Sequence, residues 1–521
     1  MCSSGRRSVL VLLAALAACG RSEPPAAVPP HVAEARRLLA EAGFPDGRGF
    51  PVLEVLYNTD EYHHKIAARL QEEWRTALGI RVELRNLEFP VFQGQVQRGE
   101  FDIARQGWIG EYDDPLAFLE LFAGGSQSNP TGWASAEYDR LLAASHDEPD
   151  PARRLALLEK ADRLLVGDAA VAPIFHYVAH NLIKPFVKGV YPTTRDIHPL
   201  QGVTLEGEGA PADGVLVFNG GAEPRSLDPA VSADVAGYKI LMHLYEGLVM
   251  PDAREAKPAP ALAERWEVSD DGRTWTFHLR PAPWSNGDPV LAGDFVYAWR
   301  RVVAPATASP YAHRMYVVQN AREIALGTAE PSTLGVKAVD DRTLEVRLVR
   351  RTPYFLQLLC MNLFFPVHRP SVESLGAPWW TKIDRVATNG PYRLSEWSLK
   401  QRKVFVKNPR YRAAGEVKLE KFVFLAIEKA ETAFNYYEAG RCHWIFRIPL
   451  AFVDIPRPDH WVNPYNGVYY YVFNTRKKPL DDPRVRRALA AVIDREKITK
   501  YILRGGEQPA SRLVPPTALP K

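Results

Sequence analysis

The alternation of apolar and polar positions predicts a chain that mixes helices and strands. Residues 33–43 follow a 3.6-residue period that ends at a glycine, and a longer helical period covers residues 61–78. Strand-like alternation over residues 52–57 precedes the longer helix, and alternation over residues 80–84 follows it. This succession is typical of a crossover between parallel strands, and it predicts an α/β fold.

The same patterns continue along the chain, with more strands in the second half. Helices are predicted over residues 152–165 and 483–494, and a strand over residues 172–177. From Val215 onward the predicted strands, separated by turn signals, are residues 215–219, 275–279, 343–348 and 403–407.

Residues 206–214 separate the two halves. They contain three glycines and one proline and few large apolar side chains, which is typical of a linker. An ordinary loop between two independent domains has the same composition. Neither half contains a complete set of lobe elements, so we expect both halves to contribute to one fold.

Composition and charge exclude several functions. The chain has 521 residues, of which 46% are hydrophobic, and its 65 basic and 61 acidic residues nearly balance without a concentrated basic stripe. Nucleic acid is therefore a poor candidate partner. A Gly-x-Ser-x-Gly elbow and a His-Glu-x-x-His motif are both missing, so an extracytoplasmic peptidase or amidase has no support. His63 and His64 are adjacent and would point about 100° apart on a helix, so we expect no metal site and no cofactor.

The first thirty residues resemble an export signal. Arg6 and Arg7 precede an apolar run at residues 9–18, and residues 16–19 read Leu-Ala-Ala-Cys, which resembles a bacterial lipobox. The resemblance implies that Cys19 carries a lipid, that residues 20–30 form a flexible tether, and that the protein is anchored to a membrane. An ordinary cleaved signal with a chance cysteine is the alternative.

Two cysteines remain after such processing, Cys360 and Cys442. An oxidising compartment permits a disulfide between them, but their spacing does not decide whether they meet.

Several long motifs occur in the second half. They are Glu-Pro-Arg-Ser-Leu-Asp-Pro at 223–229, Tyr-Glu-Gly-Leu at 245–248, Trp-Ser-Asn-Gly-Asp-Pro-Val at 284–290, Asp-Phe-Val-Tyr-Ala-Trp at 294–299, Ala-Ser-Pro-Tyr-Ala at 308–312, Thr-Asn-Gly-Pro-Tyr at 388–392, Tyr-Tyr-Tyr at 469–471 and Arg-Val-Arg-Arg-Ala-Leu at 484–489. The first half carries Phe-Asp-Ile-Ala-Arg-Gln-Gly-Trp at 101–108. Together they resemble the family 5 solute-binding proteins of ABC importers, whose best-known members bind oligopeptides.

The order of these motifs departs from the family. Its members run from the Ser-Leu-Asp-Pro strand to the Phe-Asp-x-Ala-Arg segment, whereas here the latter comes first. We therefore expect a circularly permuted, two-lobed periplasmic-binding-protein fold (type II, cluster C-like) with an extra subdomain. A natural permutation, an engineered one and a mis-joined gene all produce this order.

The resemblance implies the following division. Residues 1–19 are a lipoprotein signal and 20–30 a tether; 31–178 with 467–521 form the second ligand-binding lobe, 179–245 with 366–466 the first, and 246–365 the extra subdomain. Closure hinges are expected near residues 178 and 467.

The resemblance also implies a ligand site. Glu111 occupies the position of an acid, usually aspartate, that holds the amino end of a peptide, and Arg105 that of an arginine assisting it. His63 matches a histidine that contacts the carboxyl end of longer peptides; a surface histidine is the alternative. The further residues expected to line the cleft are Gly107, Trp108, Ile109, Tyr177, Tyr311 and Tyr470. Asn389 is expected to serve turn geometry.

The implied function is a monomeric, lipid-anchored receptor of the periplasm or cell envelope that delivers oligopeptides to an ABC permease complex. It catalyses no reaction. The same fold could instead bind a murein peptide, a metal complex or haem, or act as a non-transport sensor or peptide-scavenging chaperone.

Overall fold

The computed structural model describes residues 29–126 and 128–519. The predicted export signal, the predicted lipid attachment at Cys19 and most of the predicted tether therefore lie outside the described residues. The tether prediction was wrong at its end, because Pro30 is the first residue of helix α1 (Pro30–Glu41). Proline suits this position because the first helical turn needs no backbone donor there.

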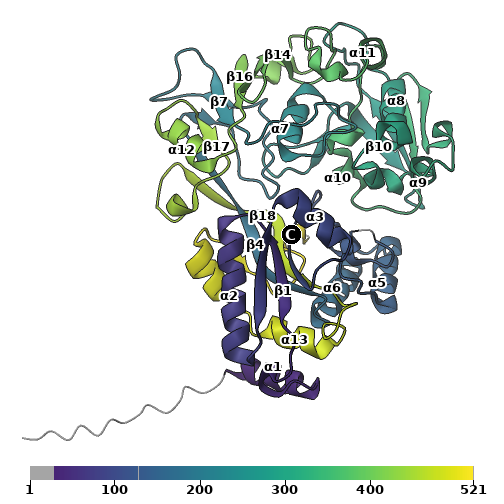
Figure 1. The fold of residues 1–521 in the computed structure, drawn as a ribbon. Helices are drawn as coiled ribbons and strands as arrows, with labels where there is room; N and C mark the ends of the chain where they lie inside the picture. Colours follow the sequence, from purple (N-terminus) through teal and green to yellow (C-terminus); the bar gives the residue numbers. More distant parts are fainter. Residues whose placement is uncertain (1–28, 127, 520–521) are drawn as a thin grey trace, which may run out of the picture.

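The elements form two groups joined by two long strands (Figure 1). We use the name lower lobe for the elements α1 to α6 with β1 to β3 and α13. The upper lobe is the set of elements from β5 (Val187–Lys188) to β17. Strands β4 (Val171–Ile183) and β18 (His460–Phe473) run between them as an antiparallel pair. The elements of the lower lobe are α1, β1 (Leu53–Asn58), α2 (Glu61–Leu78), β2 (Val82–Leu87), α3 (Phe89–Gln97), β3 (Ile103–Ile109), α4 (Leu116–Leu119), α5 (Ala136–Asp147), α6 (Pro151–Gly167) and α13 (Pro483–Ala491).

The predicted crossover is present in the lower lobe. Strands β1 and β2 are parallel neighbours, and α2 connects them. The side chain of Asp60 accepts a hydrogen bond from the backbone N–H of Tyr62 and caps the start of α2, and Gly79 ends it in the left-handed conformation (φ 70°). The second strand begins two residues later than predicted, at Val82, and helix α13 ends at Ala491 rather than Asp494.

Alternation along the central strands buries both faces of the sheet. On β18, Tyr469, Tyr471 and Phe473 join the apolar cluster beneath α1, α2 and α13. Their neighbours Val468, Tyr470 and Val472 belong to the cluster on the opposite side. Helices cover both faces of this sheet. It is mixed rather than mainly parallel, since β1 is parallel to β2 and β3 whereas β18 is antiparallel to β3 and β4.

One sheet runs through both lobes. Its strand order is β14-β15-β16-β7-β17-β4-β18-β3-β1-β2, with β19 (Gln508–Pro509) paired to β4 off this path. The upper part of this sheet comprises β7 (Leu216–Asn219), β14 (Tyr392–Ser398), β15 (Arg402–Lys407), β16 (Lys421–Leu425) and β17 (Trp444–Ile445), flanked by α7 (Val235–Leu244) and α12 (Ala430–Glu438). Residues 206–214 lie between the short strands β6 (Thr204–Leu205) and β7 without a helix or strand of their own.

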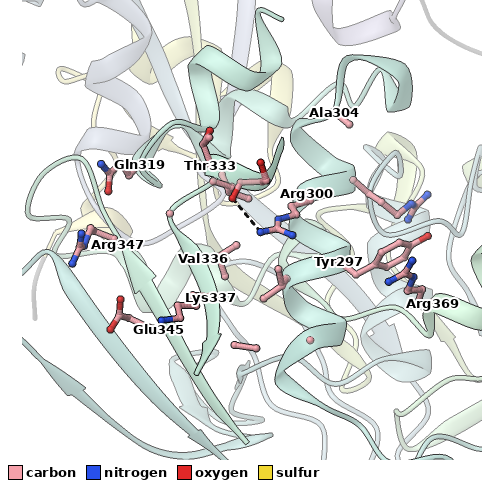
Figure 2. A pocket seen from close by; sticks show the side chains of 17 residues that line it. Tyr297, Arg300, Ala304, Gln319, Thr333, Val336, Lys337, Glu345, Arg347 and Arg369 are labelled. Atoms are coloured by element: carbon pink, nitrogen blue, oxygen red, sulfur yellow. Dashed lines mark hydrogen bonds between the residues drawn. The ribbon is translucent and has the colours of Figure 1, made fainter. Parts of the chain in front are cut away.

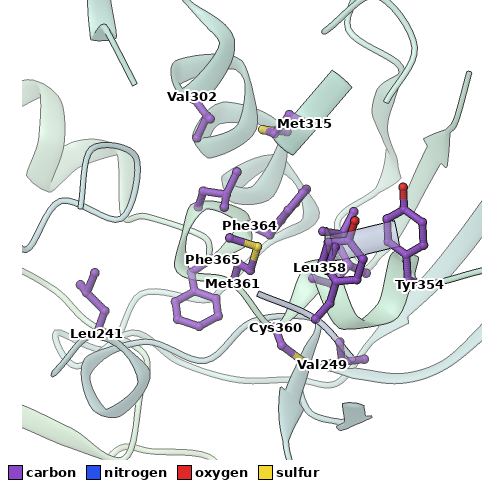
Figure 3. Packing of buried hydrophobic residues seen from close by; sticks show 14 of the residues in the cluster. Leu241, Val249, Val302, Met315, Tyr354, Leu358, Cys360, Met361, Phe364 and Phe365 are labelled. Atoms are coloured by element: carbon purple, nitrogen blue, oxygen red, sulfur yellow. The ribbon is translucent and has the colours of Figure 1, made fainter. Parts of the chain in front are cut away.

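A separate antiparallel sheet builds the outer part of the upper lobe. Its order is β10-β11-β13-β12. The elements here are β8 (Val249–Pro251), β9 (Pro258–Pro260), β10 (Ala263–Val268), β11 (Thr274–Leu279), α8 (Ala292–Val303), α9 (Ala321–Ala325), β12 (Val336–Asp340), β13 (Thr343–Arg347), α10 (Phe355–Leu359) and α11 (Arg369–Leu375). Figure 3 shows the apolar packing in this region, where Val302 and Met315 lie near Phe364 and Met361.

The two described cysteines do not form a disulfide. Cys360 and Cys442 are both buried as free thiols. The sequence had left their pairing open.

Candidate functional site

The candidate site begins on strand β3, which pairs with β18. Gly107 lies opposite Tyr469 in this ladder, and Arg105 opposite Tyr471. A Cβ atom on Gly107 would lie 2.8 Å from the hydroxyl of Tyr177. Glycine is therefore needed for the close approach of β3 to that tyrosine.

Arg105 is held among aromatic side chains. Its Nη1 donates to Oδ1 of Asn58 at 3.1 Å and its Nη2 to the hydroxyl of Tyr177 at 3.3 Å. The guanidinium carbon lies 4.8 Å from the ring centre of Tyr469, a cation–π contact. Among the described residues, Nε of Arg105 has no hydrogen-bond partner. Burial raises the pKa of Asp60, and the charge of Arg105 is one of the effects that oppose this rise.

His63 lies on α2 and is buried, with 3% of its surface exposed, so the surface alternative was wrong. Its ring contacts those of Tyr62 and Tyr469, with centroids 4.2 and 5.5 Å away. Burial, with a smaller effect from Arg105, lowers the pKa of His63 to about 2. The imidazole is therefore neutral at physiological pH and can offer a ligand a hydrogen bond but no charge.

Glu111 follows β3 and faces the upper lobe. Its Oε1 accepts a hydrogen bond from Nη2 of Arg314 at 2.5 Å, and its backbone carbonyl accepts one from Nη1 of Arg195 at 3.0 Å. Both side chains of the ion pair are largely buried, with 17% of Glu111 and 13% of Arg314 exposed. Burial raises the pKa of Glu111, and the charge of Arg314 opposes that effect. Oε2 has no hydrogen-bond partner among the described residues.

The residues that follow Glu111 also contact the upper lobe. The ring of Tyr112 stacks on that of Tyr354 at 4.4 Å with an interplanar angle of 4°. The backbone N–H of Asp113 donates to Oε1 of Gln357 at 2.5 Å. Segment 111–113 is therefore a contact point between the lobes.

The remaining expected residues are only partly gathered there. Trp108 donates from Nε1 to the carbonyl of Ala117 at 2.8 Å, and Arg314 lies 5.8 Å from its ring centre. Ile109 is 38% exposed, whereas Tyr470 is buried among core residues at 4%. The hydroxyl of Tyr311 donates to the carbonyl of Ala233 at 3.4 Å, within the upper lobe.

Arg314 and Arg195 were not anticipated from the sequence. Arg314 lies two residues after the Ala-Ser-Pro-Tyr-Ala motif, and no spacing rule connects it to Glu111, 203 positions away. The sequence indicated Tyr311 in that loop, but the contact with Glu111 comes from Arg314.

Several polar residues of the motifs that resemble the family stabilise the fold instead. Asp228 accepts hydrogen bonds from Arg301 and Trp379 at 2.7 and 3.0 Å. Asn389 bonds the backbone N–H and carbonyl of Glu246, at 3.1 and 2.9 Å. Asn389 was expected to serve turn geometry, but these contacts join it to a residue 143 positions away and so stabilise tertiary structure.

A cavity of about 750 Å³ lies away from Glu111, between α8 and β12 in the outer part of the upper lobe. Arg300 and Thr333 lie at its centre, and Arg347, Lys337 and Glu345 at its edge (Figure 2). In the described part of the chain, no group of three His, Cys, Asp or Glu side chains could hold a metal ion. None of the helices in that part is both long and apolar enough to cross a bilayer.

Known proteins show similarity to this chain. The protein from Salmonella typhimurium described as a periplasmic oligopeptide-binding protein is 38% identical over 310 residues, which cover 58% of this chain and 56% of the relative. A probable deoxycholate-binding periplasmic protein of Escherichia coli is also 38% identical, over 309 residues, 58% of this chain and 57% of the relative. The matches thus span little more than half the length of these curated relatives.

Among solved structures, the murein tripeptide binding protein of Escherichia coli superposes with a TM-score of 0.52 at 39% identity, covering 58% of this chain and 60% of that one. This likeness shows the α/β periplasmic-binding-protein fold. The family model described as bacterial extracellular solute-binding proteins, family 5 (middle), matches residues 17–130 and 257–521, more than half of the chain. The chain therefore belongs to the family 5 bacterial extracellular solute-binding proteins, a family of non-enzymatic binding proteins.

Proposed function

We propose that this protein is a substrate-binding receptor that captures oligopeptides between its lobes and delivers them to an ABC permease. The observation that carries the proposal is the position of Glu111, a buried carboxylate at the contact between the lobes of a family 5 protein. An extended peptide would lie along the strand region of β3 and β18, with backbone hydrogen bonds supplying side-chain-independent affinity. Arg105 and His63 would face the far end of the ligand.

Closure of the lobes would be the mechanism. The pairing of β18 with β4 shifts register between Pro464 and Val468, beside the predicted hinge positions 178 and 467. An interrupted ladder bends more easily than a regular one, so a change of angle between the lobes fits this place. Closure removes water from the ligand and strengthens each polar contact.

The circular permutation is part of the proposal. It is supported by the two separate segments of the family match, residues 17–130 and 257–521, and by the contribution of both chain regions to one sheet. The predicted lobe boundaries follow from this arrangement. A chain rejoined so that residues 214–519 precede residues 31–206 should fold to the same near-UV circular dichroism spectrum; loss of folding would contradict the permutation.

The lipid anchor at Cys19 completes the proposed receptor. The Cys19→Ala substitution should shift the protein from the membrane fraction to the soluble fraction, as measured by membrane fractionation. Unchanged fractionation would exclude this anchor.

Peptide binding is the decisive test. Isothermal titration with a random tetrapeptide library should show saturable binding, which Glu111→Ala weakens by about 2–5 kcal/mol if the carboxylate contributes a buried charged contact. Glu431→Ala, at an exposed position of α12, is the matched control. Equal affinities for all three proteins would remove Glu111 from the site, and no binding of peptides with either free or blocked amino ends would refute the peptide receptor.

A further inference from the structure

The carboxylate expected to hold a ligand already has a counter-ion from this chain. Arg314 reaches Glu111 from the other lobe at 2.5 Å, and both side chains are more than four-fifths buried. Arg195 adds a second guanidinium nearby, which donates to the carbonyl of Glu111 at 3.0 Å and lies 4.0 Å from the carboxylate of Asp113. The site therefore has no surplus negative charge from Glu111.

The charge balance decides which ligand end suits this place. A ligand ammonium beside the Glu111–Arg314 pair would leave one uncompensated positive charge in a largely buried site, which is unfavourable. A neutral N–H donor leaves the pair balanced. Oε2 of Glu111 is buried without a hydrogen-bond partner among the described residues, so it can accept such a donor.

At the other end of strand β3, Arg105 provides a positive charge. Arg105 is half-buried beside Tyr177, Tyr469 and Asn58, and its Nε has no hydrogen-bond partner among the described residues. The free Nε donor of Arg105 can form a charge-assisted hydrogen bond with a ligand carboxylate. Four residue steps along β3 lead from Arg105 to Ile109, a length of about 13 Å that suits a short extended ligand.

Taking these contacts together with the proposed peptide-receptor function, on which this step rests, we infer that the cleft selects peptides whose amino end is acylated and whose carboxyl end is free. The amide N–H of the acylated end donates to Oε2 of Glu111. The free carboxylate pairs with Arg105. Arg314 is then the specificity-determining residue, because it excludes a free ammonium group.

The test compares a random tetrapeptide library with free amino ends and its N-acetylated counterpart, titrated separately into the full chain. We expect the acetylated library to bind at least tenfold more tightly. Arg314→Gln removes the competing charge and should reverse the order. Arg314→Lys keeps the charge and should retain the preference for acetylated peptides, and melting curves of both variants check folding.

The outcomes separate the two proposals. Tighter binding of the free-amine library by the parent protein overturns this inference while leaving the peptide receptor intact. An unchanged preference in folded Arg314→Gln overturns the role of Arg314. Failure of both libraries to bind refutes the receptor function and this inference with it. An amidated carboxyl end should weaken binding to the parent protein but not to Arg105→Gln; equal weakening in both would remove Arg105 from the carboxylate site.

Discussion

Replacement of Asp228 by asparagine tests whether the Ser-Leu-Asp-Pro motif stabilises the fold or binds ligand. Asp228 is 3% exposed. Its Oδ2 accepts from Arg301 at 2.7 Å and from Trp379 at 3.0 Å, and its Oδ1 accepts from Arg301 at 3.3 Å and from the backbone N–H of Ala230 at 3.0 Å. Each oxygen thus faces two donors, so the NH₂ group of asparagine would meet two donors in either orientation.

The magnitude follows from the loss of the buried ion pair. Removing one partner leaves the guanidinium of Arg301, whose side chain is 19% exposed, without its counter-ion. Such losses cost about 3–5 kcal/mol. With an unfolding entropy of about 2.1 cal/mol/K for each of roughly 490 described residues, 1 kcal/mol corresponds to ~1 °C. Asp228→Asn should therefore lower the melting temperature by ~3–5 °C.

Calorimetry of Asp228→Asn beside Asp270→Asn, a substitution at an exposed position, measures this effect. We expect a shift only in the former and ligand affinity within twofold of the parent for both. An equal melting temperature for both variants would refute the stabilising role. Reduced affinity with unchanged stability would instead make Asp228 a ligand residue.

Three further predictions follow from burial. Burial raises the pKa of Asp162 to about 6, although hydrogen bonds from residues 513 and 514 oppose this rise. The folded protein therefore keeps a proton on Asp162 that the unfolded chain loses. The resulting stabilisation is fully present below about pH 4 and is lost as the pH rises through 6. Urea unfolding should show Asp162→Asn gaining up to ~3 kcal/mol over the parent between pH 4 and 7; parallel pH curves would contradict this. The pKa of His63 is lowered to about 2. The His63→Gln variant should therefore show the same pH dependence of peptide binding between pH 5 and 8 as the parent protein. Loss of a titration step near pH 6 in this variant would disprove that His63 is neutral. Burial raises the pKa of the Cys360 thiol to about 12 and that of Cys442 to about 11, so peptide mapping should find neither labelled by a thiol reagent until guanidinium unfolds the protein; rapid native labelling would contradict their burial.

Periodicity predicted the local elements of the lower lobe well. Helix α2 begins and ends at the predicted residues, 61 and 78, because its cap at Asp60 and its terminating glycine are local signals. The late start of β2 has a different cause, since its bounds are set by pairing with β1. The end of α13 was also misjudged, because the apolar pattern continues past Ala491 into a different helical turn.

The candidate site was predictable only in part. The resemblance indicated Arg105 and Glu111, and both have unusual electrostatic surroundings. The pairing of Glu111 with Arg314 joins residues 203 positions apart, and it exists only because the lobes meet there. Tyr470 was expected to line the cleft but is buried in the core. Successive side chains of a strand point to opposite faces of the sheet, and the local pattern does not specify which face meets the core and which meets the cleft.

The pairing of β3 with β18 has a consequence for synthesis of the chain. Residues 103–109 must wait for residues 467–473 before that ladder can form. At translation rates of about 5–20 residues per second, roughly 360 intervening residues delay the pairing by ~20–70 s. During that time β3 offers an unpaired edge, which favours wrong association. The arrangement of this sheet therefore makes the lower lobe dependent on protection of its early strands until the last part of the chain has emerged.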